Sequence, residues 1–270
     1  YVLGVPEVVI VRSRFIGNSG SNGGAIGMLF ANPDIYDSWF EGNEALGVGQ
    51  NYVEPGCPNF NHDEQGGAGG NSGAVVFDGL NDDGNPFVIC GSTFVDNHAN
   101  ELGGALFRTP NAGMRQMEID RCTFQDNTAR MGGVSFIKDN AVTLVDSTLV
   151  NNRSGVLVDG TQVGGPFGGL WIVDGSAEVT NCTFVDNQPT SLNVEGGGGT
   201  VVNATFVGGP PQGGLEIRNS VFSDVSCNNS LGGSDNLQWP QGTACAGGTT
   251  FADPELTPLA DNGGPTWTTM

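Results

Sequence analysis

The chain has 270 residues, enough for one large domain or two ordinary ones. Glycine supplies 45 of them, far above its usual share of about 7%, yet 37% of the chain is hydrophobic, which excludes a disordered Gly-rich linker. Nine basic against 29 acidic residues give a net charge of −20, which repels phosphate backbones and excludes nucleic-acid binding. We interpret the acidity as solubility of an exposed surface, with binding of divalent cations as the alternative.

Short runs of alternating residues recur along the chain and predict half-buried strands. They lie at 8–11, 117–120, 142–145 and 177–180. No window combines the helical apolar period with helix caps, so we expect very little helix. No apolar stretch is long enough to predict a membrane span. The first residues lack the regions of a signal peptide, so we expect the chain to begin inside a repeat of a longer precursor.

One phrase recurs with these strands: a small residue or Cys, often Thr, then an aromatic residue or Leu, two variable residues and Asn. Its aromatic or Leu markers are Phe15, Phe40, Phe94, Phe124, Leu149, Phe184, Phe206 and Phe222. Its asparagines are Asn18, Asn43, Asn97, Asn127, Asn152 and Asn187. The markers are 25, 54, 30, 25, 35, 22 and 16 residues apart, and we interpret the step of 54 as two coils plus an insertion.

A second phrase, Gly-Gly followed by an apolar or small residue, begins at Gly23, Gly103, Gly132, Gly168 and Gly213. A helix-free unit of ~22–30 residues cannot bury its apolar face alone, whereas units stacked ~4.8 Å apart can. We therefore predict an all-β, right-handed parallel β-helix of about nine or ten coils. The markers would form an internal stack, the asparagines a ladder at one corner, and the Gly-Gly pairs corners with positive φ or close backbone approach. A β-sandwich explains the strands but not repeats locked in phase.

The domain organisation follows from the repeats. We assign residues 1–225 to the coils, with an insertion at about 44–72, and residues 226–270 to a C-terminal loop and closing segment of the same domain. The insertions at 44–72 and 153–168 and the Gly-rich run 194–200 are expected contact features. The open strand edge near 8–11 is expected to be covered by flanking sequence or another subunit.

These phrases resemble the right-handed parallel β-helix repeats of the pectin-lyase-like superfamily. Gly-Gly-Ala-Ile paired with Phe-x-x-Asn is similar to the repeats of polymorphic outer-membrane proteins. Residues 227–266, ending in Asp-Asn-Gly-Gly-Pro-Thr, resemble the closing segment of secreted bacterial "choice-of-anchor" β-helix proteins. The resemblance implies a bacterial protein that is extracellular, on the cell surface or associated with the outer membrane. It also implies a disulfide between Cys227 and Cys245.

The other four cysteines are assigned from their positions. Cys57 lies in the long insertion and is predicted to pair with Cys90. Cys122 and Cys182 share a phase of the repeat but lie two coils apart, about 9.6 Å, which is too far for a disulfide. We expect both to be buried free thiols.

The resemblance makes a polysaccharide lyase or glycoside hydrolase the alternative function. The sequence lacks the Gly-His-Gly and Arg-x-Lys motifs of polygalacturonase-like sites. The candidate charged groups are interpreted as solvated outward charges: Asp120, Arg121 and Arg130; Lys138 and Asp139; Glu216 and Arg218. A possible carboxylate pair is drawn from Asp96, Asp126 and Asp186, but their regular recurrence indicates corner residues rather than a single catalytic pair. No catalytic residue is assigned.

A calcium site is predicted at Asn81, Asp82, Asp83 and Asn85, where the sequence resembles the first half of an oxygen-ligand loop. An Asx-rich turn explains this segment equally well. His62 and His98 are expected at the surface. The sequence thus favours a non-catalytic extracellular or cell-surface protein, a scaffold, adhesin or envelope component with cell-surface glycans or other envelope proteins as partners.

Overall fold

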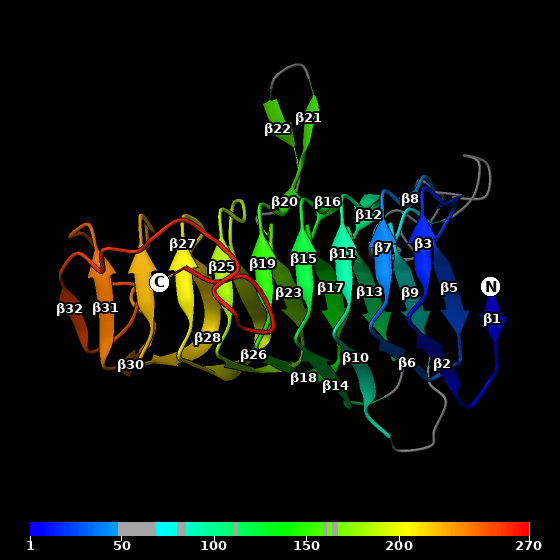
Figure 1. Cartoon of the computed structure of the whole chain (residues 1–270), viewed down its shortest axis with the longest axis horizontal. Coiled ribbons are helices and arrows are strands. Elements are labelled where there is room, and N and C mark those ends of the chain that lie inside the picture. Colours follow the sequence, from blue (N-terminus) through cyan, green and yellow to red (C-terminus); the bar gives the residue numbers. More distant parts are fainter. Residues whose placement is uncertain (48–68, 80–84, 111–112, 159–160, 164–166, 270) are drawn as a thin grey trace, which may run out of the picture.

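The structure, a computed structural model, describes residues 1–47, 69–79, 85–110, 113–158, 161–163 and 167–269. Short strands form a stack of coils, and each strand pairs in parallel with its equivalent in the next coil (Figure 1). The predicted all-β parallel β-helix is therefore confirmed, and the described residues contain no helix.

Each of the first five coils contributes four strands, which form four rows along the stack. The first row holds β1 (Val2–Leu3), β5 (Ile26–Leu29), β9 (Val75–Asp78), β13 (Leu106–Thr109), β17 (Ser135–Lys138) and β23 (Leu170–Val173). The second row holds β2 (Val8–Val11), β6 (Pro33–Tyr36), β10 (Phe87–Cys90), β14 (Arg115–Asp120), β18 (Asn140–Val145) and β24 (Ser176–Thr180). The fourth, shorter row holds β4 (Ser19–Gly20), β8 (Glu44–Ala45), β12 (His98–Leu102), β16 (Thr128–Met131) and β20 (Arg153–Ser154).

The third row is a ten-stranded sheet that runs the whole length of the stack. Its strands are β3 (Arg14–Ile16), β7 (Trp39–Glu41), β11 (Thr93–Val95), β15 (Thr123–Gln125), β19 (Thr148–Val150), β25 (Thr183–Val185), β27 (Thr205–Val207), β29 (Val221–Ser223), β31 (Asn236–Trp239) and β32 (Thr249–Phe251). The stacked coils therefore continue beyond residue 225, because β31 and β32 extend this sheet to Phe251.

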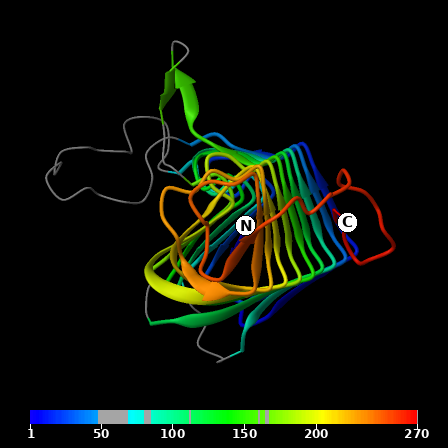
Figure 2. The same ribbon diagram turned by 90° about the vertical axis from the view of Figure 1, so that its left-hand side faces the viewer.

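The first and second rows merge in the later coils. The strands β26 (Leu192–Val202) and β28 (Pro211–Arg218) each span both rows, and the short β30 (Gly232–Ser234) pairs with the end of β28. The Gly-rich run 194–200 is part of β26, where a Cβ on Gly197 or Gly199 would collide with carbonyl oxygens of the preceding coil. The run is therefore part of a strand of the sheet. An antiparallel hairpin of β21 (Val156–Val158) and β22 (Thr161–Val163) projects from the fifth coil (Figure 2).

The marker step of 54 residues is one coil, not two. Phe40 in β7 pairs with Phe94 in the adjacent β11, and their rings stack 4.7 Å apart. The extra length lies within that coil, between β8 and β9 and between β9 and β10. The spacing between two markers gives the number of residues in a coil, not the number of coils. An insertion therefore lengthens a coil without adding another coil to the stack.

Inward apolar side chains alternate with outward ones in these segments, which explains why they form strands with one face in the core. In β18 the inward side chains Val142 and Leu144 are buried, while Thr143 and Val145 face outward. The inward residues of three rows form one continuous core. Stacked phenylalanines fill its third-row side, with ring centroids 4.7–5.3 Å apart from Phe15 to Phe124 and from Phe184 to Phe222. Buried Leu149 separates the two runs.

An asparagine ladder follows the same edge of the stack. Asn127 is fully buried; its backbone N–H and its Nδ2 donate to Asn152 Oδ1, each at 3.0 Å, and its Nδ2 also donates to the Phe94 carbonyl at 2.9 Å. Its own Oδ1 accepts from the backbone N–H and Nδ2 of Asn97. The same pattern joins Asn18, Asn43, Asn97, Asn127, Asn152 and Asn187. These side chains satisfy backbone groups that the turn leaves without strand partners.

The two glycines of the Gly-Gly phrase lie at a corner of the coil, and each is required there for a different reason. Gly103 has φ +66°, a conformation that favours glycine. A Cβ on the following Gly104 would collide with the carbonyl oxygen of Gly133 in the next coil. The first glycine is therefore required by its φ angle and the second by close packing of successive coils.

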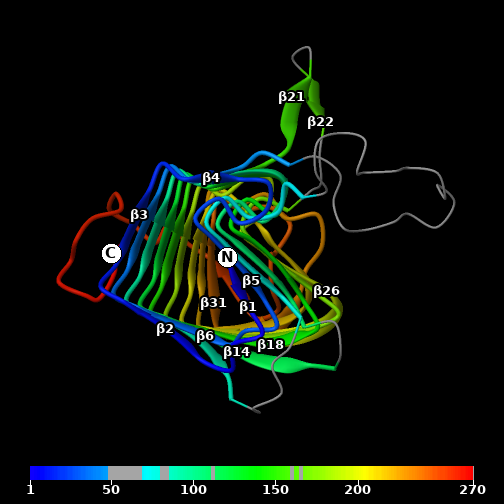
Figure 3. The ribbon, with the colours of Figure 1, turned by 90° about the vertical axis from the view of Figure 1, so that its right-hand side faces the viewer.

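The two ends of the stack differ. At the N-terminal end, β1, β2, β3 and β4 each have one edge without a strand partner among the described residues (Figure 3). At the C-terminal end, the phenylalanine column reaches Gln238, which is buried and bonds Thr243 O and Cys245 N. A hydrogen-bonded polar side chain therefore interrupts the aromatic column before Phe251, which has the same register position on β32.

Candidate interaction surface

The outer face of the ten-stranded sheet carries two regular columns of side chains. One column contains Thr93, Thr123, Thr148, Thr183 and Thr205 on successive strands. The other contains Val95, Gln125, Val150, Val185 and Val207. Because strands in a parallel sheet lie about 4.8 Å apart, equivalent side chains repeat at that spacing along the face. The ten-stranded sheet beneath this face runs the whole length of the stack.

Tryptophans lie near both ends and over the middle of this face. Trp39 in β7 is 36% exposed and Trp239 in β31 is 42% exposed. The Trp39 indole donates to Glu41 Oε2 at 2.8 Å, and the Arg14 guanidinium lies 5.9 Å from the ring centroid. Trp267, 55% exposed, belongs to the C-terminal segment that crosses the face.

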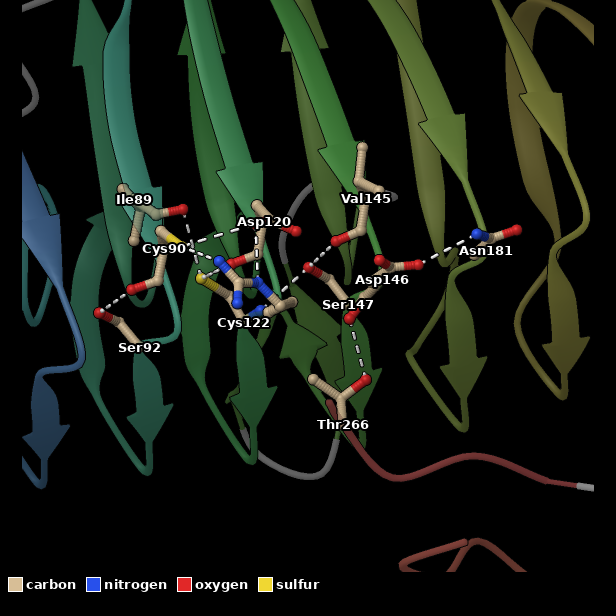
Figure 4. Close-up of polar contacts among 11 residues, drawn as sticks. Ile89, Cys90, Ser92, Asp120, Cys122, Val145, Asp146, Ser147, Asn181 and Thr266 are labelled. Atoms are coloured by element: carbon tan, nitrogen blue, oxygen red, sulfur yellow. Dashed lines mark hydrogen bonds and ion pairs between the residues drawn. The ribbon is translucent and has the colours of Figure 1, made fainter. Parts of the chain in front are cut away.

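The segment after β32 folds back along the outer side of this sheet (Figures 1 and 2). Thr148 Oγ1 donates to the Trp267 carbonyl at 2.5 Å, and Thr266 Oγ1 donates to the Asp146 carbonyl at 3.0 Å (Figure 4). Thr148 is buried beneath it. The C-terminal segment is therefore fixed near the fifth coil, and it carries Trp267 onto the face.

The charged residues singled out in the sequence lie on outward faces in separate ion pairs. Arg121 pairs with Asp120, Arg218 with Glu216, and Arg130 with Glu101 at 2.5 Å. Lys138 lies 2.8 Å from Asp174 and 3.3 Å from Asp139. The hydrogen bond with Asp174 raises the pKa of Lys138, so its amine is held as a cation at neutral pH. These pairs are spread over several coils and over the first, second and fourth rows rather than brought together.

The three recurring aspartates occupy a strained corner. Asp96, Asp126 and Asp186 have φ angles of 53°, 55° and 51°. Asp and Asn are the side-chain-bearing residues that most readily adopt this left-handed conformation. The conformation accounts for their recurrence one residue before each ladder asparagine.

The corner between the second-row and third-row strands carries a column of serines, in which cysteine takes the place of serine twice. Ser92 and Ser147 each donate from Oγ to a carbonyl two residues earlier and accept a backbone N–H from the preceding coil (Figure 4). Cys122 and Cys182 replace serine in this column; each is a buried free thiol. Burial raises the pKa of both thiols to about 12.

A disulfide joins Cys227 and Cys245, as the resemblance implied, and it ties the loop before β30 to the segment after β31. The predicted pairing of Cys57 with Cys90 is wrong, because Cys90 is a free thiol, while Cys57 itself lies outside the described residues. Cys90 points outward from the end of β10, and its Sγ lies 2.9 Å from Arg121 Nη2 and 3.5 Å from Asp120 Oδ2 in the next coil (Figure 4). Burial raises the pKa of Cys90, and the charge of Arg121 opposes that shift.

Most of the predicted calcium loop lies outside the described residues, which include Asn85 but not Asn81, Asp82 or Asp83. The described part of the chain holds no group of three or more His, Cys, Asp or Glu side chains arranged to bind a metal ion. His98 lies in β12, half-buried, with Nδ1 2.9 Å from Thr128 Oγ1, and His62 lies outside the described ranges. No helix among the described residues is long and apolar enough to cross a membrane.

Sequence patterns did not reveal an aromatic cluster outside the core, on the outer face of the first row. Phe107 stacks on Phe136 at 5.4 Å, and Phe136 meets Trp171 edge-on at 4.9 Å. The signal lies in the strands themselves, because β13, β17 and β23 carry apolar residues on both faces; the outward Phe107 and Trp171 are buried and Phe136 is half-buried. Arg108 was also missed: it is buried on the inward side of β13, donates to the Gly79 carbonyl at 2.8 Å, and burial lowers its pKa to about 10.

Comparisons of the chain with protein-family models, with curated proteins and with solved structures found no match.

Proposed function

We propose that this protein is a non-catalytic extracellular or cell-surface protein whose β-helix acts as a rigid adhesive scaffold. Its contact surface is the outer face of the ten-stranded sheet. The observation that carries the proposal is that three of the four tryptophans of the chain, Trp39, Trp239 and Trp267, are exposed on that face. Exposed indoles combine apolar area with an N–H donor and are enriched at binding interfaces.

Two further features support this role. The Cys227–Cys245 disulfide fits an oxidising compartment. The buried phenylalanine and asparagine columns repeat from coil to coil, so they give a stiff support to a long surface. We propose cell-surface glycans as the partner, because neutral sugar rings present flat apolar faces that stack on exposed indoles.

Binding to a panel of neutral and acidic polysaccharides and to intact bacterial surfaces tests the proposal. We expect retention of the wild-type protein without release of new reducing or unsaturated ends. The triple variant Trp39→Ala, Trp239→Ala, Trp267→Ala should lose retention. A matched control, Leu46→Ala with Met114→Ala, removes comparably exposed apolar side chains elsewhere and should bind like the wild type. Cleavage of any polysaccharide would overturn the proposal in favour of an enzyme, and retention of the triple variant would exclude this face.

A further inference from the structure

The ninth coil lacks a first-row strand. In earlier coils this row is continuous from β1 to β28, whose first half, Pro211–Leu215, pairs with β26. The next strand, β30, pairs only with the second half of β28, through Glu216, Ile217 and Arg218. Between β29 and β30, all within the described range 167–269, the chain instead forms the disulfide-tethered loop. The outer edge of β28 from 211 to 215 therefore has no strand partner among the described residues (Figure 1).

A pocket of about 330 Å³ lies along this edge. Pro210, Pro211, Gln212 and Gly213 line it on the β28 side, with Asn193 from the preceding coil; Cys227, Asn228, Asn229 and Leu231 line it on the loop side. The pocket thus occupies the position that a first-row strand of the ninth coil would take.

The lining is neutral and rich in carboxamides. Asn193, Gln212, Asn228 and Asn229 supply four, and no charged side chain lines the pocket. Asn193 is 5% exposed and its side chain lines the pocket. A carboxamide both donates and accepts hydrogen bonds. A ligand that offers both N–H and C=O groups matches this lining.

We propose that this pocket binds an extended, uncharged peptide segment of another protein, which adds to β28 as a parallel strand. An unpaired strand edge presents N–H and C=O groups to such a segment. The added strand continues the parallel interface that already joins every first-row strand to the next. Asn193 and Gln212, adjacent in one outward column, contact its backbone or side-chain amides.

A suitable probe is the capped, uncharged peptide Ser-Leu-Asn-Val-Gln-Gly, the sequence of residues 191–196 with Gln in place of Glu195; that segment fills the same row in the seventh coil. Saturation with this probe should slow amide hydrogen exchange at Gly213 and Leu215, whose N–H groups face the open edge, and not at Gln212 and Gly214, whose N–H groups face β26. A version with N-methylated central amides should not bind, because it lacks the N–H donors of a strand. Equal binding of the two peptides, or no slowing at these amides, would overturn the proposal.

Side-chain variants locate the site. Asn193→Ala and Gln212→Ala should each weaken binding about fivefold, as expected for one lost hydrogen bond. Gln116→Ala is the matched control, because Gln116 is also an outward glutamine, on β14 of the second row. Unchanged unfolding midpoints would show that each variant is folded. Protection of the same amides by maltose, with none from the peptide, would identify a sugar site and refute strand addition.

Discussion

Replacement of Asn127 by alanine tests whether the asparagine ladder holds the coils together. Asn127 is fully buried in the middle of the stack and bonds both neighbouring coils. Its removal leaves the Asn97 backbone N–H without a partner, and the Phe94 carbonyl and Asn97 Nδ2 each lose one hydrogen bond but keep another, to β15 and to Phe40 O. At about 1–3 kcal/mol for the orphaned N–H and about 0.5–1.5 kcal/mol for each of the two other lost bonds, we expect a loss of about 2–6 kcal/mol in the free energy of unfolding.

Asn18 is the matched control, because it is the same residue in the same column at the open end of the stack. Asn18→Ala removes only the bond from Nδ2 to Asn43 Oδ1, and that oxygen still accepts from the Asn18 backbone N–H. Its cost should be below about 1 kcal/mol. Urea unfolding followed by intrinsic fluorescence measures both variants. Losses that differ by less than about 1 kcal/mol would refute the claim that the ladder satisfies buried backbone groups.

Three further predictions follow from the cysteines and ion pairs. Replacing Cys227 and Cys245 together by serine should lower the free energy of unfolding by about 3 kcal/mol for a loop of this size, as measured by urea unfolding; an unchanged midpoint would contradict it. Burial raises the pKa of Cys122 and Cys182 from 9.0 to about 12, so their neutral thiols stabilise the fold fully below pH 9 and this contribution is lost as the pH rises toward 12. The variant Cys122→Ser, Cys182→Ser should therefore lose less stability over that pH range than the wild type. Equal slopes of unfolding free energy against pH for the two proteins would refute the assignment. Lys138→Met should change stability by less than about 1 kcal/mol, because its ion pairs are exposed to solvent; a larger loss in thermal unfolding would show that the pairs matter more than their exposure implies.

The repeated phrases predicted the fold because each residue in them has one physical role in every coil. Phe94 and Phe124 stack inside, and Asn97 and Asn127 bond between coils, so the identity of the residue fixes its position. The aspartates before Asn97, Asn127 and Asn187 are explained by their positive φ angles. Identity at a fixed offset is a strong signal when the same structural demand recurs.

Features that occur once were not visible in the same way. The step of 54 residues was misassigned because an insertion and an extra coil lengthen the chain alike. The Cys57–Cys90 pairing assumed proximity that no repeat supported, and Cys90 instead faces Arg121 in the next coil. The outer aromatic cluster arises from packing across coils of Phe107, Phe136 and Trp171, which are far apart in sequence. The pocket beside β28 arises from a strand that is missing, and a missing strand leaves no motif.

The two proposed surfaces are separable because they belong to different rows. The tryptophan face belongs to the third row, which continues through β31 and β32, whereas the pocket belongs to the first row, which stops at β28. The Trp39, Trp239 and Trp267 substitutions remove no side chain that lines the pocket, and the Asn193 and Gln212 substitutions leave the tryptophan face unchanged. A chain that binds polysaccharide through one row can therefore bind a peptide strand through another. If the triple tryptophan variant lost both polysaccharide binding and peptide binding, the two rows would not act independently, and the separation of the two surfaces would be refuted.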